Sequence, residues 1–178
     1  MSIRPALAAD LPAILAIYNA VIATSTAVYT ETPATLADRQ AWFAARTEQG
    51  YPVLVADEGG EAVGYASFGD FRAWPGYRHT VEHSVHIRAD RQGRGLGKEL
   101  VSALFPYAAG LDKHVMIAGI DAANEASLRM HERLGFTQAG RFNEVGRKFD
   151  RWLDLVFLQR FLEPDDFSRD HQVIPTEI

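Results

Sequence analysis

The chain has 178 residues, a formal net charge of -5, and 47% hydrophobic and 23% charged residues. These values are typical of a globular protein, and the length predicts one domain with a sizeable core. Cysteine is absent, which excludes disulfides, thiolate metal ligands and an acyl-cysteine intermediate. Without a membrane-length apolar run or the apolar core of a signal peptide, the sequence predicts a cytoplasmic protein.

In the first half of the chain, hydrophobic periodicity predicts strand 3–7, helix 11–23, helix 36–49, and strands 52–57 and 62–71. Asp10 is a candidate N-cap for the first helix. Thr35 and Asp38 resemble a capping box on the second, which Gly50 would end. The turn sequence Glu58-Gly-Gly-Glu61 makes the two strands a hairpin.

The second half is expected to hold turn 74–77, strand 80–87, helix 98–109, strand 114–120, helix 124–134 and antiparallel strands 136–145 and 152–162. We therefore expect one domain over residues 1–163, followed by a polar tail at 164–178. The sequence contains no internal repeat and no linker to a second domain.

A glycine-rich stretch, Arg88-Ala-Asp-Arg-Gln-Gly-Arg-Gly-Leu-Gly-Lys98, lies between a predicted strand and a predicted helix. Glycines at alternate positions leave backbone N–H groups unshielded, and a helix N-terminus attracts anions. The loop therefore predicts a phosphate or pyrophosphate site. Cationic side chains within an acidic chain favour a small anionic ligand over nucleic acid. These side chains are Arg91, Arg94 and Lys98.

The spacing of this loop excludes two common phosphate motifs. A Walker A loop fails because Gln92 and Glu99 stand where it needs a glycine and a hydroxyl residue. A G-x-G-x-x-G fingerprint fails because its third glycine would fall on Lys98 or Leu100. A strand-to-helix turn without a ligand stays open as an alternative.

The segment His79-Thr-Val-Glu-His83 matches the H-x-x-E-H motif of a class of zinc proteases, which requires a helix. Alternating polar and β-branched residues predict a strand here instead. At ~3.3 Å per residue, the two histidines would lie about 13 Å apart, too far for one zinc ion. We therefore expect no metal site.

The same alternation sets Glu82, Ser84 and His86 on one face of the strand against Val81, His83, Val85 and Ile87 on the other. A carboxylate in the middle of a strand is costly unless it meets water, a partner or a substrate. Glu82 is thus either a rim carboxylate paired with an arginine, or a general base or ammonium-binding group for an amine. Both interpretations stay open.

A second candidate site lies in the helix that starts near Asn124. Asn124, Ser127 and His131 fall at helical spacings of three and four and share one face. Asn124 also suits the N-cap of that helix, so capping alone could explain it.

Two levels of resemblance follow from these motifs. The pattern Gln92-x-x-Gly95-x-Gly97 resembles the acyl-CoA pyrophosphate loop of the GCN5-related N-acetyltransferases (GNAT), and the element order over residues 3–162 is similar to theirs. The stretches TVEHSVHI, NEASLRMHERLGF and GRKFDRWLDLVFLQ resemble the phosphinothricin/methionine sulfone acetyltransferase branch. The resemblance implies an α/β (α+β) fold with a mixed central sheet flanked by helices.

The resemblance implies acetyl-CoA as co-substrate and, as acceptor, the α-amine of phosphinothricin, methionine sulfoximine or methionine sulfone, by direct transfer in a ternary complex. Backbone N–H groups of Val85, His86 and Ile87 would hold pantetheine and polarise the thioester carbonyl. Asn124 and Ser127 would line the pantetheine arm. The residues implied at the pyrophosphate are Gly93, Arg94, Gly95, Leu96, Gly97 and Lys98.

Glu82 is implied near the acceptor amine, as a base acting directly or through water. His131 stands where many members have a tyrosine that protonates the thiolate, so it is either an optional acid or a packing residue. Arg72 offers a bidentate donor to an α-carboxylate. Trp74 and Tyr29 would complete the acceptor site.

The resemblance also implies a homodimer, in agreement with the aromatic residues of the last two strands, which are Phe142, Phe149, Trp152, Phe157 and Phe161. Other functions stay open: acetylation of a protein N-terminus, an aminoglycoside or a polyamine within the same fold, or a non-catalytic acyl-CoA-binding module. The carboxylate of Glu82 favours an enzyme over the last of these.

Overall fold

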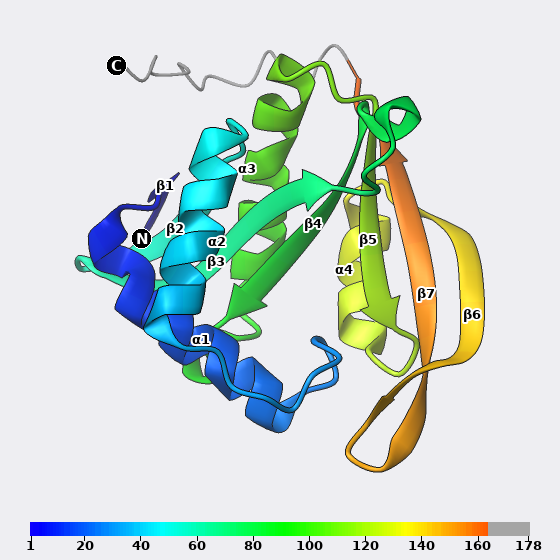
Figure 1. The fold of residues 1–178 in the computed structure, drawn as a ribbon, viewed down its shortest axis with the longest axis horizontal. Coiled ribbons are helices and arrows are strands. Elements are labelled where there is room, and N and C mark those ends of the chain that lie inside the picture. Colours follow the sequence, from blue (N-terminus) through cyan, green and yellow to red (C-terminus); the bar gives the residue numbers. More distant parts are fainter. Residues whose placement is uncertain (164–178) are drawn as a thin grey trace.

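The computed structural model describes residues 1–163, so the predicted tail at 164–178 lies outside the described residues. The expected order of strands and helices is confirmed (Figure 1). The elements are β1 (Ser2–Pro5), α1 (Leu11–Thr24), α2 (Leu36–Glu48), β2 (Val53–Glu58), β3 (Glu61–Asp70), β4 (Thr80–Ile87), α3 (Leu96–Gly110), β5 (Val115–Asp121), α4 (Glu125–Arg133), β6 (Thr137–Lys148) and β7 (Arg151–Phe161).

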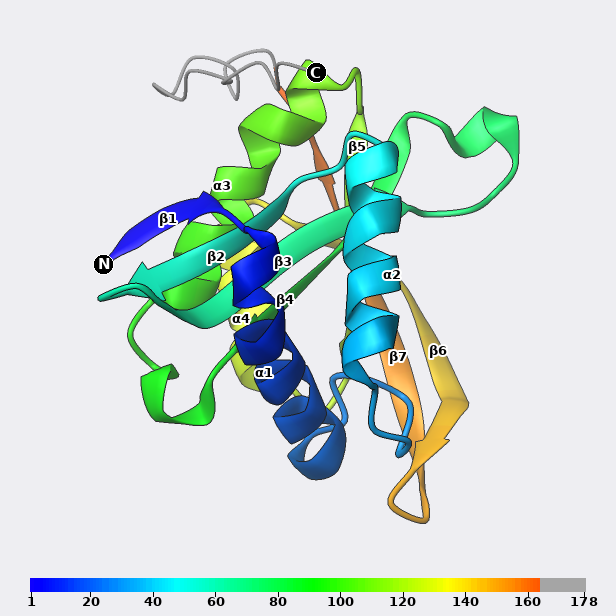
Figure 2. The ribbon, with the colours of Figure 1, turned by 60° about the vertical axis from the view of Figure 1, so that its left-hand side comes forward.

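The strands form one seven-stranded sheet in the order β1-β2-β3-β4-β5-β7-β6. Neighbouring strands are antiparallel except β4 and β5, which run parallel because α3 connects them. α1 and α2 cover one face of the sheet, and α3 and α4 cover the other (Figures 1 and 2). The fold is therefore the mixed sheet between helices that the sequence predicts.

β4 and β5 separate in the middle of the sheet. Their registered pairs are Thr80 with Val115, Val81 with Met116 and Glu82 with Ile117. β4 remains paired with β3 as far as Ile87, opposite Gly64. Figure 1 shows the two strands spreading apart beyond this short contact. Within residues 1–163, the second half of β4 therefore has a strand on one side only, which opens the sheet between β4 and β5.

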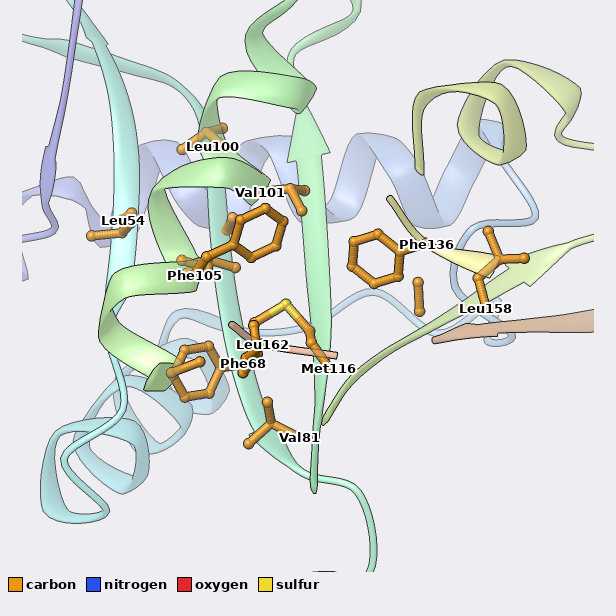
Figure 3. Packing of buried hydrophobic residues seen from close by; sticks show 14 of the residues in the cluster. Leu54, Phe68, Val81, Leu100, Val101, Phe105, Met116, Phe136, Leu158 and Leu162 are labelled. Atoms are coloured by element: carbon orange, nitrogen blue, oxygen red, sulfur yellow. The ribbon is translucent and has the colours of Figure 1, made fainter. Parts of the chain in front are cut away.

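A large apolar core lies between the sheet and α3. Leu100 and Val101 of α3 are fully buried and belong to one cluster with Val81 of β4, Met116 of β5 and Phe136 before β6 (Figure 3). A smaller cluster on the other face joins α1 and α2 to β2 and β3. The sheet is thus fixed from both sides, and the gap between β4 and β5 lies in a rigid frame.

Two local details differ from the sequence-based expectations. Asp10 precedes α1, but its carboxylate accepts hydrogen bonds from Arg4 and from the N–H of Leu7 and makes no side-chain cap to α1. Arg4 engages both carboxylate oxygens of Asp10, and such a bidentate ion pair is stronger than a single bond to an uncharged backbone N–H. α3 begins at Leu96, two residues before Lys98, because Gly95 takes a left-handed conformation with φ 85°.

Other local expectations are confirmed. The capping box of Thr35 and Asp38 opens α2, and Asn124 caps α4 by accepting a hydrogen bond from the N–H of Ser127. β4 covers the predicted residues 80–87, so H-x-x-E-H lies on a strand apart from its first residue. Among residues 1–163, no helix is long and apolar enough to cross a membrane.

Candidate functional site

Two adjoining cavities lie where β4 and β5 separate. The first, here called the central cavity, has a volume of about 360 Å³ and contains Glu82. The second, the glycine-loop cavity, has a volume of about 560 Å³ and contains the loop at residues 93–97. The two cavities share five lining residues: Ala27, Val85, His86, Asn124 and Ser127. A ligand long enough to follow β4 could therefore lie in both.

The structure brings most of the sequence-predicted residues to these cavities. The central cavity is lined by Glu82, Val85, His86, Asn124, Ser127 and His131. The glycine-loop cavity is lined by Val85, His86, Ile87, Gly93, Gly95, Leu96, Gly97, Lys98, Asn124 and Ser127. The glycine loop and Glu82 thus belong to one continuous site, although they lie at opposite ends of β4.

Glu82 is half-buried beside the gap between β4 and β5. Burial raises the pKa of its carboxyl, and the positive charge of Arg72 opposes this rise. A Cβ at Gly119 of β5 would lie 2.9 Å from Oε1 of Glu82, so glycine at this position leaves the carboxylate free to lie where it does. A carboxylate with a raised pKa in a cavity has the properties of a general base.

His131 and His83 form a buried pair behind Glu82. Nδ1 of His131 lies 2.7 Å from the carbonyl oxygen of Ser127, and this nitrogen must donate because a carbonyl only accepts. Nε2 of His131 lies 3.1 Å from Nε2 of His83. In the neutral tautomer fixed by Ser127, His131 Nε2 accepts and His83 Nε2 donates.

Both imidazoles of this pair are held neutral. Burial lowers the pKa of His83 to about 3, with help from His131 and His86. Burial also lowers the pKa of His131, against the hydrogen bond to Ser127. In this arrangement Nε2 of His131 carries no proton. To act as an acid, His131 would first have to gain a proton on that nitrogen.

The glycine loop has the backbone form that an anion site needs. Gly93 and Gly95 have φ values of 75° and 85°, in the left-handed region that favours glycine. Gly95 is the N-cap of α3, and the buried Leu96 anchors the first turn to the core. The N–H groups at the start of α3 therefore lie at the cavity, together with the positive end of the helix dipole.

The cationic side chains near the loop differ from the sequence-based set. Lys98 lines the glycine-loop cavity, whereas Arg94 is not among its lining residues. Arg91 is paired with Glu58 and Asp90 and is thus partly neutralised. Arg133 of α4 lines this cavity and was not indicated by the loop sequence. Its approach depends on how α4 packs beside α3, which no local motif records.

Three predicted acceptor residues lie outside the lining of both cavities. Arg72 is exposed, stacks 4.1 Å above the ring of Phe71 and donates to the Phe71 carbonyl oxygen, but its charge still acts on Glu82. Trp74 is 77% exposed. Tyr29 donates a 3.4 Å hydrogen bond to the Asp154 carbonyl oxygen. These residues lie on loops and do not line the interior of the site.

The loop after α1 is fixed to the C-terminal hairpin. Lys148 is 1% exposed, and its Nζ donates to the carbonyl oxygens of Ser25 at 2.6 Å and Val28 at 2.8 Å. Thr26 also donates a hydrogen bond to Asp121 at the end of β5. Since Ala27 and Val28 line the central cavity, these contacts position one of its walls.

Sequence analysis missed one wall of the central cavity. Tyr18 of α1, Arg39 and Trp42 of α2, and Tyr65 of β3 all line it. These residues come from three elements and fit no spacing rule, and their aromatic and amphipathic patterns also fit ordinary core packing. Only the packing of α1 and α2 on the sheet brings them together.

Comparisons with known proteins agree with this geometry. The family model "Acetyltransferase (GNAT) domain" matches residues 1–137. An L-methionine sulfoximine/L-methionine sulfone acetyltransferase of Pseudomonas paraeruginosa is 55% identical over 92% of this chain and 95% of that protein.

Two crystal structures share the fold. A phosphinothricin acetyltransferase from Sinorhizobium meliloti in complex with acetyl-CoA has a TM-score of 0.88 and 37% identity, over 97% of this chain and 93% of that one. A ribosomal-protein-alanine N-acetyltransferase from Brucella melitensis has a TM-score of 0.89 and 45% identity, over 91% of this chain and all of that one.

The glycine loop gives a first prediction. Gly95→Ala places a Cβ on a residue with φ 85°, which costs about 1–2 kcal/mol and disturbs the N–H groups at the start of α3. We expect the dissociation constant for coenzyme A, measured by calorimetry, to rise about tenfold or more.

Gly60→Ala is the matched control, because Gly60 has φ 91° in the β2–β3 turn and no atom within 4 Å of its added Cβ. It should lower the melting temperature in the same way and leave coenzyme A binding unchanged. Equal affinity of the Gly95 variant and the native protein would contradict the assignment of the loop.

Proposed function

The chain belongs to the GNAT acetyltransferase family, and we propose that it transfers an acetyl group from acetyl-CoA to the α-amine of a small amino-acid analogue. The observation that carries this proposal is the continuity of the two cavities: a site for a long anionic ligand meets the half-buried carboxylate of Glu82. The proposed acceptors are methionine sulfoximine, methionine sulfone and phosphinothricin, in line with the names of the relatives. A cytoplasmic location is part of the proposal.

The donor fits the chain's own groups. We place the pyrophosphate of acetyl-CoA at residues 93–98, where N–H groups, Lys98 and the dipole of α3 favour an anion. The pantetheine arm would follow the unpaired edge of β4 at residues 85–87, past Asn124 and Ser127. N–H groups on that edge would polarise the thioester carbonyl, since no strand in the described part of the chain pairs with them there.

At the other end, Glu82 would take a proton from the acceptor ammonium, directly or through a water molecule. The free amine attacks the thioester carbonyl, a C–N bond forms, the C–S bond breaks to release the thiolate of CoA, and the nitrogen loses its second proton to that thiolate or to water. An ordinary thiol has a pKa near ~8.5, so its thiolate leaves with little assistance. Transfer is direct in a ternary complex, because the chain has no cysteine to carry the acetyl group.

We assign His131 a positioning role in this scheme. Its ring is fixed between Ser127 and His83, and it supports the wall along which the pantetheine arm would run. Solvent or a residue of the acceptor site can protonate the thiolate. An acid role for His131 would first require breaking its contact with His83.

A protein N-terminus is the second candidate acceptor, since one structural relative is a ribosomal-protein-alanine N-acetyltransferase. Such an acceptor carries an amide in place of the free α-carboxylate. Arg72 is the cation whose charge acts on Glu82. In this proposal its planar guanidinium group binds the free carboxylate next to the reacting amine. The charge of Arg72, which acts on Glu82, therefore favours the free amino acid.

We also propose that the protein is a homodimer. Four of the five aromatic residues predicted for an interface are exposed in the single chain, at 42–60%: Phe142, Phe149, Trp152 and Phe161. Phe157 packs instead against Phe71 and Phe142. Exposed aromatic residues concentrated on one hairpin are typical of an interface.

The Glu82→Gln variant tests the base. The amide keeps the shape but cannot accept the proton, so kcat should fall by roughly 10²–10⁴ while coenzyme A affinity is unchanged. Only the carboxylate form of Glu82 is active, and burial raises the pKa of this group. The kcat/KM of the native enzyme should therefore fall as the pH drops through this raised pKa, which lies above the usual carboxyl range.

This acid limb should disappear in the Glu82→Gln variant. Glu132→Gln, an exposed change on α4 outside both cavities, is the control and should behave as native. Native-like kcat and an unchanged acid limb in the Glu82 variant would exclude Glu82 as the base.

The acceptor carboxylate gives the next prediction. Methionine sulfone should be turned over with a kcat/KM about 10- to 100-fold above that of its methyl ester, because the ester removes one charge-assisted bond. Arg72→Met should abolish this ratio, whereas Arg78→Met in the same exposed loop should preserve it. Equal turnover of acid and ester by the native enzyme would favour a protein N-terminus as acceptor.

Sedimentation velocity at micromolar concentration tests the dimer. The chain mass is 19.7 kDa, and we expect a species of about twice that mass. Trp152→Ser removes an exposed aromatic side chain and should shift the equilibrium toward the monomer. A native protein that sediments as a single chain would refute the dimer.

A further inference from the structure

The wall of the central cavity that sequence analysis missed combines three aromatic rings with one cation. The guanidinium carbon of Arg39 lies 4.1 Å from the ring centre of Tyr18 and 5.2 Å from that of Trp42. The rings of Trp42 and Tyr65 meet edge to face at 5.9 Å. All four side chains line the same cavity as Glu82. They form a patch here called the aromatic-arginine wall.

The guanidinium of Arg39 has few hydrogen-bond partners and no paired carboxylate within the described part of the chain. It is half-buried, and its Nε is buried without a hydrogen-bond partner among residues 1–163. In that range no carboxylate lies within ion-pair distance of it. Its hydrogen bond to Tyr65 and its stacking on Tyr18 satisfy it only in part. A buried donor left without a partner is costly, so a cation in this state is suited to a ligand oxygen.

The two arginines near the site act on different places. Arg72 is the cation that acts on Glu82, whereas the charge of Arg39 acts on His86 and Tyr65. The α-carboxylate of an amino acid is next to its amine, so it belongs with Glu82 and Arg72. Arg39 is therefore available to a group farther along the acceptor side chain.

We propose that the aromatic-arginine wall is the subsite for the end of the acceptor side chain. Arg39 donates hydrogen bonds to an oxygen on tetrahedral sulfur or phosphorus, and the rings of Tyr18, Trp42 and Tyr65 contact the methyl group on the same atom. Methionine sulfone, methionine sulfoximine and phosphinothricin all carry this combination of a methyl group and an oxygen. The inference rests on the proposed function and names the group that selects its substrates.

Methionine and methionine sulfone form a matched pair of acceptors, because they differ only in the two oxygens on sulfur. The native enzyme should prefer the sulfone. Arg39→Met should lower kcat/KM for the sulfone about 10- to 100-fold, the effect of losing a hydrogen bond from a charged donor, and leave kcat/KM for methionine within about twofold. Binding of coenzyme A should not change.

Gln40→Met is the matched control, since Gln40 is the exposed neighbour of Arg39 on α2 and should keep the native preference. Arg39→Lys keeps the charge and the apolar stem but loses the planar fork, so it should fold and show an intermediate loss. Arg39→Lys replaces Arg39→Met in the test if circular dichroism shows that Arg39→Met is unfolded.

The outcomes separate the subsite from the proposed function. An equal loss for both acceptors, or an unchanged preference for the sulfone, would overturn the role of Arg39 while the acetyltransferase activity stands. A native enzyme that uses both acceptors equally would overturn it as well. If the native enzyme acetylates neither, the proposed function fails, and the subsite fails with it.

Discussion

The site depends on the short parallel contact between β4 and β5. Only residues 80–82 of β4 are registered with β5, and the strands then separate while β3 continues to hold β4. A sheet interrupted in this way leaves polar backbone groups that no strand of residues 1–163 satisfies, and such groups take water or a ligand as hydrogen-bond partner. Glu82 lies at the point of separation, which places a carboxylate beside the opening. Gly119 on the opposite strand leaves it space.

Buried polar side chains then give the opening its chemical character. The pair of His83 and His131 is neutral and is joined by hydrogen bonds to each other and to Ser127 of α4, so it forms a wall without charge. The charged groups lie on the opposite side, with Glu82 and Arg39 in one cavity. The proposed acceptor would thus meet a charge distribution that the fold fixes before it binds, which lowers the cost of ordering the site.

The acceptor side of the site also depends on contacts between distant segments. Lys148 near the end of β6 holds the loop after α1 through two carbonyl oxygens, and burial lowers its pKa while Glu31 opposes this. Its ammonium is largely satisfied by uncharged acceptors, so its role is to join two segments more than 100 positions apart. The same hairpin carries the exposed aromatic residues, which links the acceptor wall to the proposed dimer interface.

The sequence by itself determined the features set by local rules. The order of elements, the bounds of β4, the capping box of Thr35 and the cap at Asn124 follow from periodicity and side-chain chemistry within a few residues. The loop at 93–98 follows from glycine spacing. The tertiary structure decided the rest, because the remaining contacts join residues far apart in the chain. Arg39 reaches the cavity of Glu82 only through the packing of α2. His131 acquires its tautomer from a carbonyl of its own helix and from His83 on β4. The lowered pKa values of His83 and His131 come from burial. Burial depends on the whole fold and cannot be read from any short segment.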